Sequence, residues 1–158
     1  MFSILAPIVV PSIVTLAAWV AYNFAAEPVL ALRKAREEAL KAADRYWSVN
    51  DASSDQTRDN AIKALNDAAS ALAGHGLADS IAVRSYCACF GVDLEVAAGC
   101  LRVLVEGPRG EYSVADKTRK LRRNALFVSL GSKRRLSPAE IAAASEAIAA
   151  ARRESGRA

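Results

Sequence analysis

From Phe2 to Ala26 no side chain carries a charge, and this run sets narrow limits on how the chain folds. The 21 Lys and Arg residues and the 17 Asp and Glu residues all lie from Glu27 onward. As a helix, a run of about 25 residues rises about 37 Å, which exceeds the roughly 30 Å hydrocarbon thickness of a bilayer. The run is therefore long enough to cross a membrane with some tilt.

The apolar residues of this run lie on every side of a helical wheel, so no polar stripe is left to face water. They are Ile4, Leu5, Ile8, Val9, Val10, Ile13, Val14, Leu16 and Val20. Trp19, Tyr22 and Phe24 gather at its C-terminal end, where amphipathic rings favour the headgroup level. We therefore predict that residues 1–26 form a transmembrane anchor with Trp19, Tyr22 and Phe24 at its interface.

Two other interpretations of the run are a cleaved secretory signal and a buried core helix. A signal normally carries a basic region before a shorter apolar stretch, followed by a small-residue cleavage site. No Lys or Arg precedes this run, and Phe24 puts a bulky ring three residues before a cut after Ala26. A soluble core helix seldom keeps so many uncharged residues. A retained anchor fits best.

The flanking charges predict the orientation. Arg33, Lys34, Arg36 and Lys41 lie within about fifteen residues of the span, and excess Lys and Arg mark the cytoplasmic side. We expect a single-pass protein of the bacterial inner membrane with its C-terminal part in the cytoplasm. The cysteines would then be reduced thiols, because that compartment disfavours disulfides.

The rest of the chain is predicted to be all-α. Apolar residues make up 53% of the sequence, which disfavours disorder, and alanine, the best helix former, is abundant. We expect an amphipathic juxtamembrane helix over 27–48 that starts anew at Pro28, a loop over 49–57, a helical head over 58–153 and a tail over 154–158. The fold class is therefore one transmembrane helix followed by a bundle of about five helices.

Local signals place the helix boundaries in the head. We expect helices to end near Gly74 and Gly76, at Gly91 and at Gly107-Pro108, and to begin after Asp93. Ser113 with Asp116 resembles a capping box. The strongest signal is Ser137-Pro138-Ala139-Glu140, which combines an N-cap, a first-turn Pro and a capping Glu before the last helix.

Residues able to support catalysis or metal binding are few. The only histidine, His75, lies between two glycines and is interpreted as a capping or loop residue. Cys87 and Cys89 would point about 200° apart on one helix and could not share an ion, so we expect them and Cys100 to be small buried side chains. No phosphate loop, zinc-protease motif or serine-hydrolase motif occurs. We therefore predict no enzyme, no metal and no cofactor.

One segment, 117–135, concentrates positive charge and contains no acid. Its basic residues are Lys117, Arg119, Lys120, Arg122, Arg123, Lys133, Arg134 and Arg135. The segment fits a solvated surface, a contact with anionic lipid headgroups or an acidic protein, or a contact with nucleic acid. Nucleic acid is the less favoured of these, because no aromatic interleaving or recognition-helix signature accompanies the charge.

Several features together resemble a group of uncharacterised short bacterial proteins with one N-terminal membrane span and a small helical domain. They are the apolar anchor, the basic helix ending in Tyr46-Trp47, and the stretches 65–72 (LNDAASAL) and 119–126 (RKLRRNAL). The resemblance implies an anchored helical architecture and no activity.

From these observations we expect a non-enzymatic interaction module, such as an accessory subunit or adaptor, whose partners are the bilayer and another protein. The alternative is a membrane-tethered protein that binds nucleic acid through segment 117–135.

Overall fold

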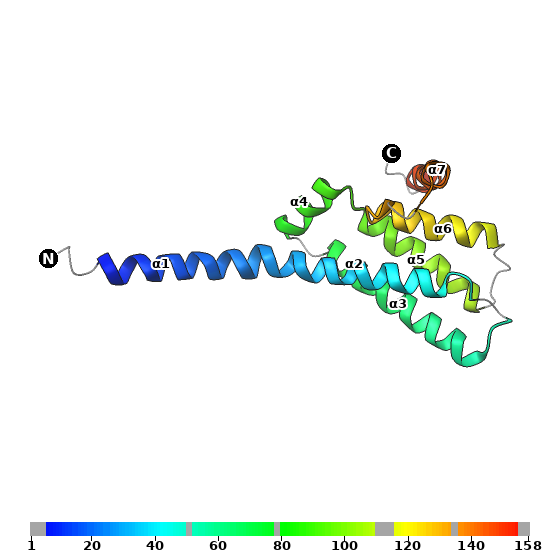
Figure 1. Cartoon of the computed structure of the whole chain (residues 1–158), viewed down its shortest axis with the longest axis horizontal. Coiled ribbons are helices and arrows are strands. Elements are labelled where there is room, and N and C mark those ends of the chain that lie inside the picture. The colour runs from blue at the N-terminus through cyan, green and yellow to red at the C-terminus, as the bar shows by residue number, and fades with distance from the viewer. Residues whose placement is uncertain (1–5, 50–51, 78–79, 110–115, 134–135, 155–158) are drawn as a thin grey trace.

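The computed structural model describes residues 6–49, 52–77, 80–109, 116–133 and 136–154, and within them the protein is helical with no strand. Figure 1 shows one long helix that projects from a bundle of shorter helices. The predicted fold class, a long apolar N-terminal helix followed by a helical bundle, is confirmed.

The projecting helix is continuous from residue 6 to residue 46. It comprises α1 (Ala6–Ala21), a π-helical segment η1 (Tyr22–Ala26) and α2 (Glu27–Tyr46). The expectation that Pro28 starts a separate helix is wrong. Proline has no N–H for the carbonyl four residues earlier, and its ring crowds that carbonyl. The wider π-helical turn of η1, in which the Glu27 N–H donates to the Tyr22 carbonyl, lies at the place where the proline ring would crowd the helix. This turn lets the helix continue.

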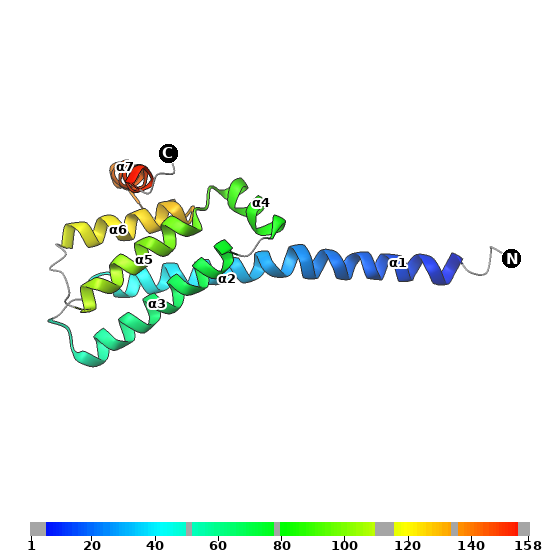
Figure 2. The ribbon, with the colours of Figure 1, turned by 180° about the vertical axis from the view of Figure 1, so that it is seen from behind.

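The bundle contains α2 and five further helices. These are α3 (Asp55–Leu77), α4 (Ile81–Phe90), α5 (Leu94–Arg109), α6 (Asp116–Ser129) and α7 (Pro138–Glu154). α3 packs against α2 and α5, α5 packs against α6, and α7 lies on α6 (Figure 2). The core is built mainly from leucine and alanine, which lets the helices approach closely. Its largest fully buried side chains are Phe127, Leu32, Leu65, Leu72, Leu101, Leu104, Leu126 and Leu130.

α2 belongs to this core, which differs from the expected division into a juxtamembrane helix and a separate head. Leu32, Ala39, Ala42 and Ala43 of α2 are buried against the other helices. The connection from Tyr46 to Asp55 reverses the chain so that α3 packs back along α2. The loop therefore joins two packed helices and does not separate an anchor from a head.

The helix caps follow the sequence signals where those are local. The Ser137 N–H donates to Glu140 Oε2 at 3.0 Å, and the Glu140 N–H donates to Ser137 Oγ at 3.3 Å, which confirms the capping box. Asp93 Oδ1 accepts from the Val96 N–H at 3.1 Å and caps α5. Gly91 ends α4 with φ of 60°, as expected. The Ser113 part of the other predicted box lies outside the described residues.

Two further predicted helix ends lie close to the observed ones. α3 includes Gly74 and Gly76 and ends at Leu77, and α5 includes Gly107-Pro108 and ends at Arg109. The packing of α3 against α5 outweighs the entropic cost of glycine, which is only about 1 kcal/mol per residue. Proline near a helix end removes a single hydrogen bond, and its fixed φ is compatible with the helix.

Candidate membrane interface

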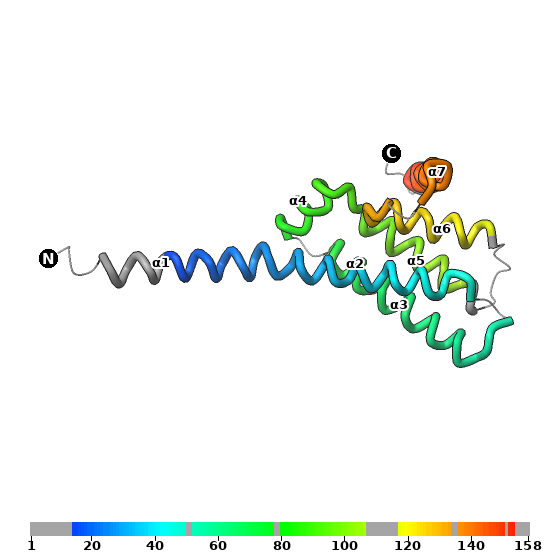
Figure 3. The backbone as a smooth tube through the Cα atoms, viewed as in Figure 1, coloured from blue at the N-terminus to red at the C-terminus, as the bar shows by residue number. Residues whose placement is uncertain are grey.

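The second half of the apolar helix α1, from Val14 to Ala21, is exposed along its whole length. Val14, Leu16, Trp19 and Val20 are exposed, and none of the apolar window that starts at Val14 is buried. One helix is thus long and apolar enough to cross a membrane. Over the described side chains from Val14 onward, the other helices of the bundle do not cover it. In the tube of Figure 3, the part of this helix from residue 14 onward already extends beyond the other helices.

The three aromatic residues expected at the interface are all exposed and lie just before the first charge, Glu27. Phe24 is the most exposed, at 69%, and Trp19 and Tyr22 are more than half exposed. Between them, Asn23 Nδ2 donates to the Trp19 carbonyl at 2.8 Å. This contact satisfies one of the two N–H donors of the Asn23 amide within the helix. The placement suits an interfacial belt, which stays a prediction.

The basic segment 117–135 is not one exposed patch, because Arg119 is buried. Only 7% of Arg119 is exposed, and its Nη1 donates to the Val49 carbonyl at 2.9 Å. The expectation that Arg119 contributes to a surface is wrong. Its role is to hold the C-terminal end of the α2 region against α6.

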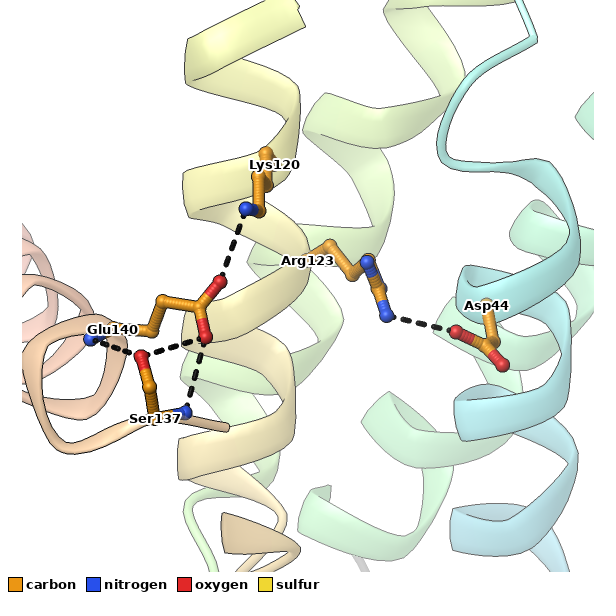
Figure 4. A network of polar contacts seen from close by, with 5 residues as sticks. All are labelled: Asp44, Lys120, Arg123, Ser137 and Glu140. Atoms are coloured by element: carbon orange, nitrogen blue, oxygen red, sulfur yellow. Dashed lines mark hydrogen bonds and ion pairs between the residues drawn. The ribbon is translucent and has the colours of Figure 1, made fainter. Parts of the chain in front are cut away.

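Arg123 also has partners within the chain. Its Nη2 lies 2.9 Å from Asp44 Oδ1, and its guanidinium carbon lies 5.3 Å from the Trp47 ring centroid and 5.4 Å from that of Phe127. A planar guanidinium between an acid and two rings joins α6 to α2. Figure 4 shows the ion pair beside a second network.

The second network in Figure 4 joins α6 to the start of α7. Lys120 Nζ lies 3.1 Å from Glu140 Oε1, while the other carboxylate oxygen of Glu140 accepts from Ser137. The Ser137 backbone N–H, followed by Lys120 and the Ser137 hydroxyl, lowers the pKa of Glu140 from 4.5 to about 2. The charge of Lys120 is therefore paired with Glu140 in a structural contact at the surface.

The segment has five other basic residues. Lys117 and Lys133 are exposed, and Arg122 is half-buried. Arg134 and Arg135 lie outside the described residues. The sequence does not distinguish these five residues from Arg119, Lys120 and Arg123. The partners of those three are Val49, Glu140 and Asp44, respectively, and each partner is distant along the chain.

The cysteines and His75 differ in burial. Cys100 is buried, and burial raises its pKa to about 11. Cys87 is half-buried, and its pKa is raised first by burial and then by Asp93. Cys89 is exposed, so the expectation that all three are buried is wrong for Cys89. His75 lies within α3 and not in a loop. The described part of the chain contains no cluster of three or more metal-ligating side chains.

Sequence reasoning missed a groove between the end of α3 and the start of α5, with a volume of about 740 Å³. Its apolar lining consists of Ala73, Gly76, Leu77, Leu94, Val96, Ala98 and Gly99. Asp93, Glu95, Arg102 and Arg152 provide charge around it, and Arg152 forms an ion pair with Asp93. No alanine or glycine periodicity in the sequence indicates that these two helix ends meet.

Known protein families, curated proteins and solved structures were compared with the chain, and none of them matches it.

Proposed function

We propose that this protein is a single-pass membrane protein of the bacterial inner membrane whose helical bundle serves as a non-enzymatic interaction module in the cytoplasm. The observation that carries the proposal is the uncharged helix α1, which extends beyond the bundle and whose apolar side chains from Val14 onward are exposed. Residues 6–26 rise about 31 Å as a helix, which matches the bilayer core. Lipid is the environment in which that surface is stable.

The charges after Glu27 support a cytoplasmic bundle. α2 continues the line of α1, so Arg33, Lys34, Arg36 and Lys41 follow directly after the apolar length. Arg33 and Lys34 are exposed. An excess of Lys and Arg this close to a span favours the cytoplasmic side.

The groove between α3 and α5 supports the proposed role in binding another protein. Gly99 lies within α5, where glycine is about 1 kcal/mol less favourable than alanine, and a Cβ added there would meet no atom within 4 Å. Nothing in the described chain therefore requires glycine at this position. A partner helix or strand that approaches closely would require it, and the exposed Leu77 beside the groove would then be covered.

Nucleic-acid binding is the weaker alternative. The contacts of Arg119, Lys120 and Arg123 reduce the positive charge that segment 117–135 offers to phosphates. Binding to nucleic acid should fall steeply with salt, which distinguishes it from a protein contact in the apolar groove.

The experiment that tests this function has two parts. Full-length protein should stay in the membrane fraction after carbonate extraction, and a C-terminal reporter that works only in the cytoplasm should be active. Recovery in the soluble fraction, or a reporter active only in the periplasm, would contradict the proposal.

The second part is affinity purification in mild detergent from the source cell. Wild type should retain a stoichiometric protein partner that Gly99→Leu loses, while the matched exposed variant Ala143→Leu on α7 keeps it. Co-purification of nucleic acid in place of protein would favour the alternative.

A further inference from the structure

α4 has a fixed position beside the base of the anchor. It packs against both α2 and η1, and η1 comprises residues 22–26 of the uncharged run. In Figures 1 and 2, α4 lies at the end of the bundle from which α1 projects. Part of α4 is therefore level with the last apolar residues before Glu27.

The contacts of α4 show which of its ends approaches the anchor. Tyr86 accepts a hydrogen bond at 3.2 Å from Arg36 Nη1, and the Phe90 carbonyl lies near Gly131, close to the Arg36 guanidinium. Arg36 is ten residues beyond Ala26, which is about 15 Å along a helix. The C-terminal end of α4 therefore lies farther along α2 from η1, and its N-terminal end lies nearer to η1 (Figure 1).

The first turn of α4 presents an apolar side chain to the outside at this level. Ile81 is 79% exposed, whereas Val83 on the opposite side is buried in the core. α4 contains no acidic residue. Water does not stabilise an exposed isoleucine side chain. The helix that carries it contacts η1, which contains the exposed Tyr22 and Phe24.

We infer that the first turn of α4 is a second membrane contact, with Ile81 inserted at the boundary between headgroups and acyl chains beside the point where the anchor leaves the bilayer. This inference rests on the proposed membrane anchor. Apolar side chains on a helix near a bilayer surface bind at that boundary by burying their area in it. Because Tyr86 and Arg36 fix α4 to α2, the contact would also fix the tilt of the bundle against the membrane.

The test is the depth of spin labels on full-length protein reconstituted into vesicles of phosphatidylcholine and phosphatidylglycerol. The background is Cys87→Ser with Cys89→Ser, and buried Cys100 is kept because its thiol is protected. Single labels go on Ile81→Cys, on Leu16→Cys in the anchor and on Ala143→Cys as an exposed control on α7. Circular dichroism checks that each variant is folded.

Collisions with lipid-soluble oxygen, relative to a water-soluble nickel chelate, report the depth of each label. We expect this ratio to be several-fold higher at Ile81 and at Leu16 than at Ala143. If the ratio at Ile81 equals that at Ala143 while the ratio at Leu16 is higher, the anchor is supported and the α4 contact is refuted. If Leu16 also matches Ala143, the anchor is refuted and the α4 contact with it.

Discussion

Replacing Gly131 by alanine should destabilise the bundle by more than the same replacement at Gly91. Both glycines end a helix with positive φ, 68° at Gly131 and 60° at Gly91. In both turns a later N–H reaches back five residues: Ser132 to the Phe127 carbonyl at 2.8 Å, and Val92 to the Cys87 carbonyl at 2.9 Å. The two sites therefore share the same backbone strain for alanine.

Their surroundings differ. A Cβ on Gly131 would lie 2.9 Å from the Phe90 carbonyl oxygen, a backbone atom that cannot rotate away, whereas a Cβ on Gly91 would meet nothing within 4 Å. The left-handed conformation costs alanine about 1 kcal/mol at either site. Overpacking adds about 1–3 kcal/mol, so we expect a loss of about 1 kcal/mol for Gly91→Ala and about 2–4 kcal/mol for Gly131→Ala.

The assay is thermal unfolding of full-length protein in mild detergent, followed by circular dichroism at 222 nm. At about 2–4 °C per kcal/mol for a chain of this size, the midpoint of Gly131→Ala should fall at least twice as far as that of Gly91→Ala. Equal shifts would refute the reasoning, because they would mean that the turn after α6 does not press on the end of α4.

Three further predictions concern stability. The pKa of Glu140 is lower in the folded state than in the unfolded state. In the wild type, its stabilising contribution should therefore be present above about pH 5 and lost as the pH falls toward 2. In urea unfolding, Glu140→Gln should lack that part of the pH dependence of stability. Gly99→Ala should raise the free energy of unfolding by about 0.5–1 kcal/mol, and a decrease would show that the site is not open. A double-mutant cycle of Arg123→Gln and Asp44→Asn should give a coupling energy below about 1 kcal/mol, since Asp44 is partly exposed; no coupling at low salt would contradict the ion pair.

The sequence by itself determined the features that depend on neighbouring residues. The apolar character of α1 is a property of a continuous run, and it requires no knowledge of the rest of the fold. The Ser137–Glu140 box and the end of α4 at Gly91 are also local, because each cap joins groups only a few residues apart. These predictions succeed because the interactions that produce them act within one or two helical turns.

Only the tertiary structure decided the features whose partners are distant along the chain. Arg119 contacts a carbonyl 70 residues away and Arg123 an acid 79 residues away, so a segment that looks uniformly basic divides into buried, paired and exposed charges. Packing likewise keeps α3 helical through Gly74 and Gly76, and it places α4 beside η1. Charge and helix propensity are read from single residues, but burial depends on which helix faces which, and in this chain that depends on contacts between distant segments.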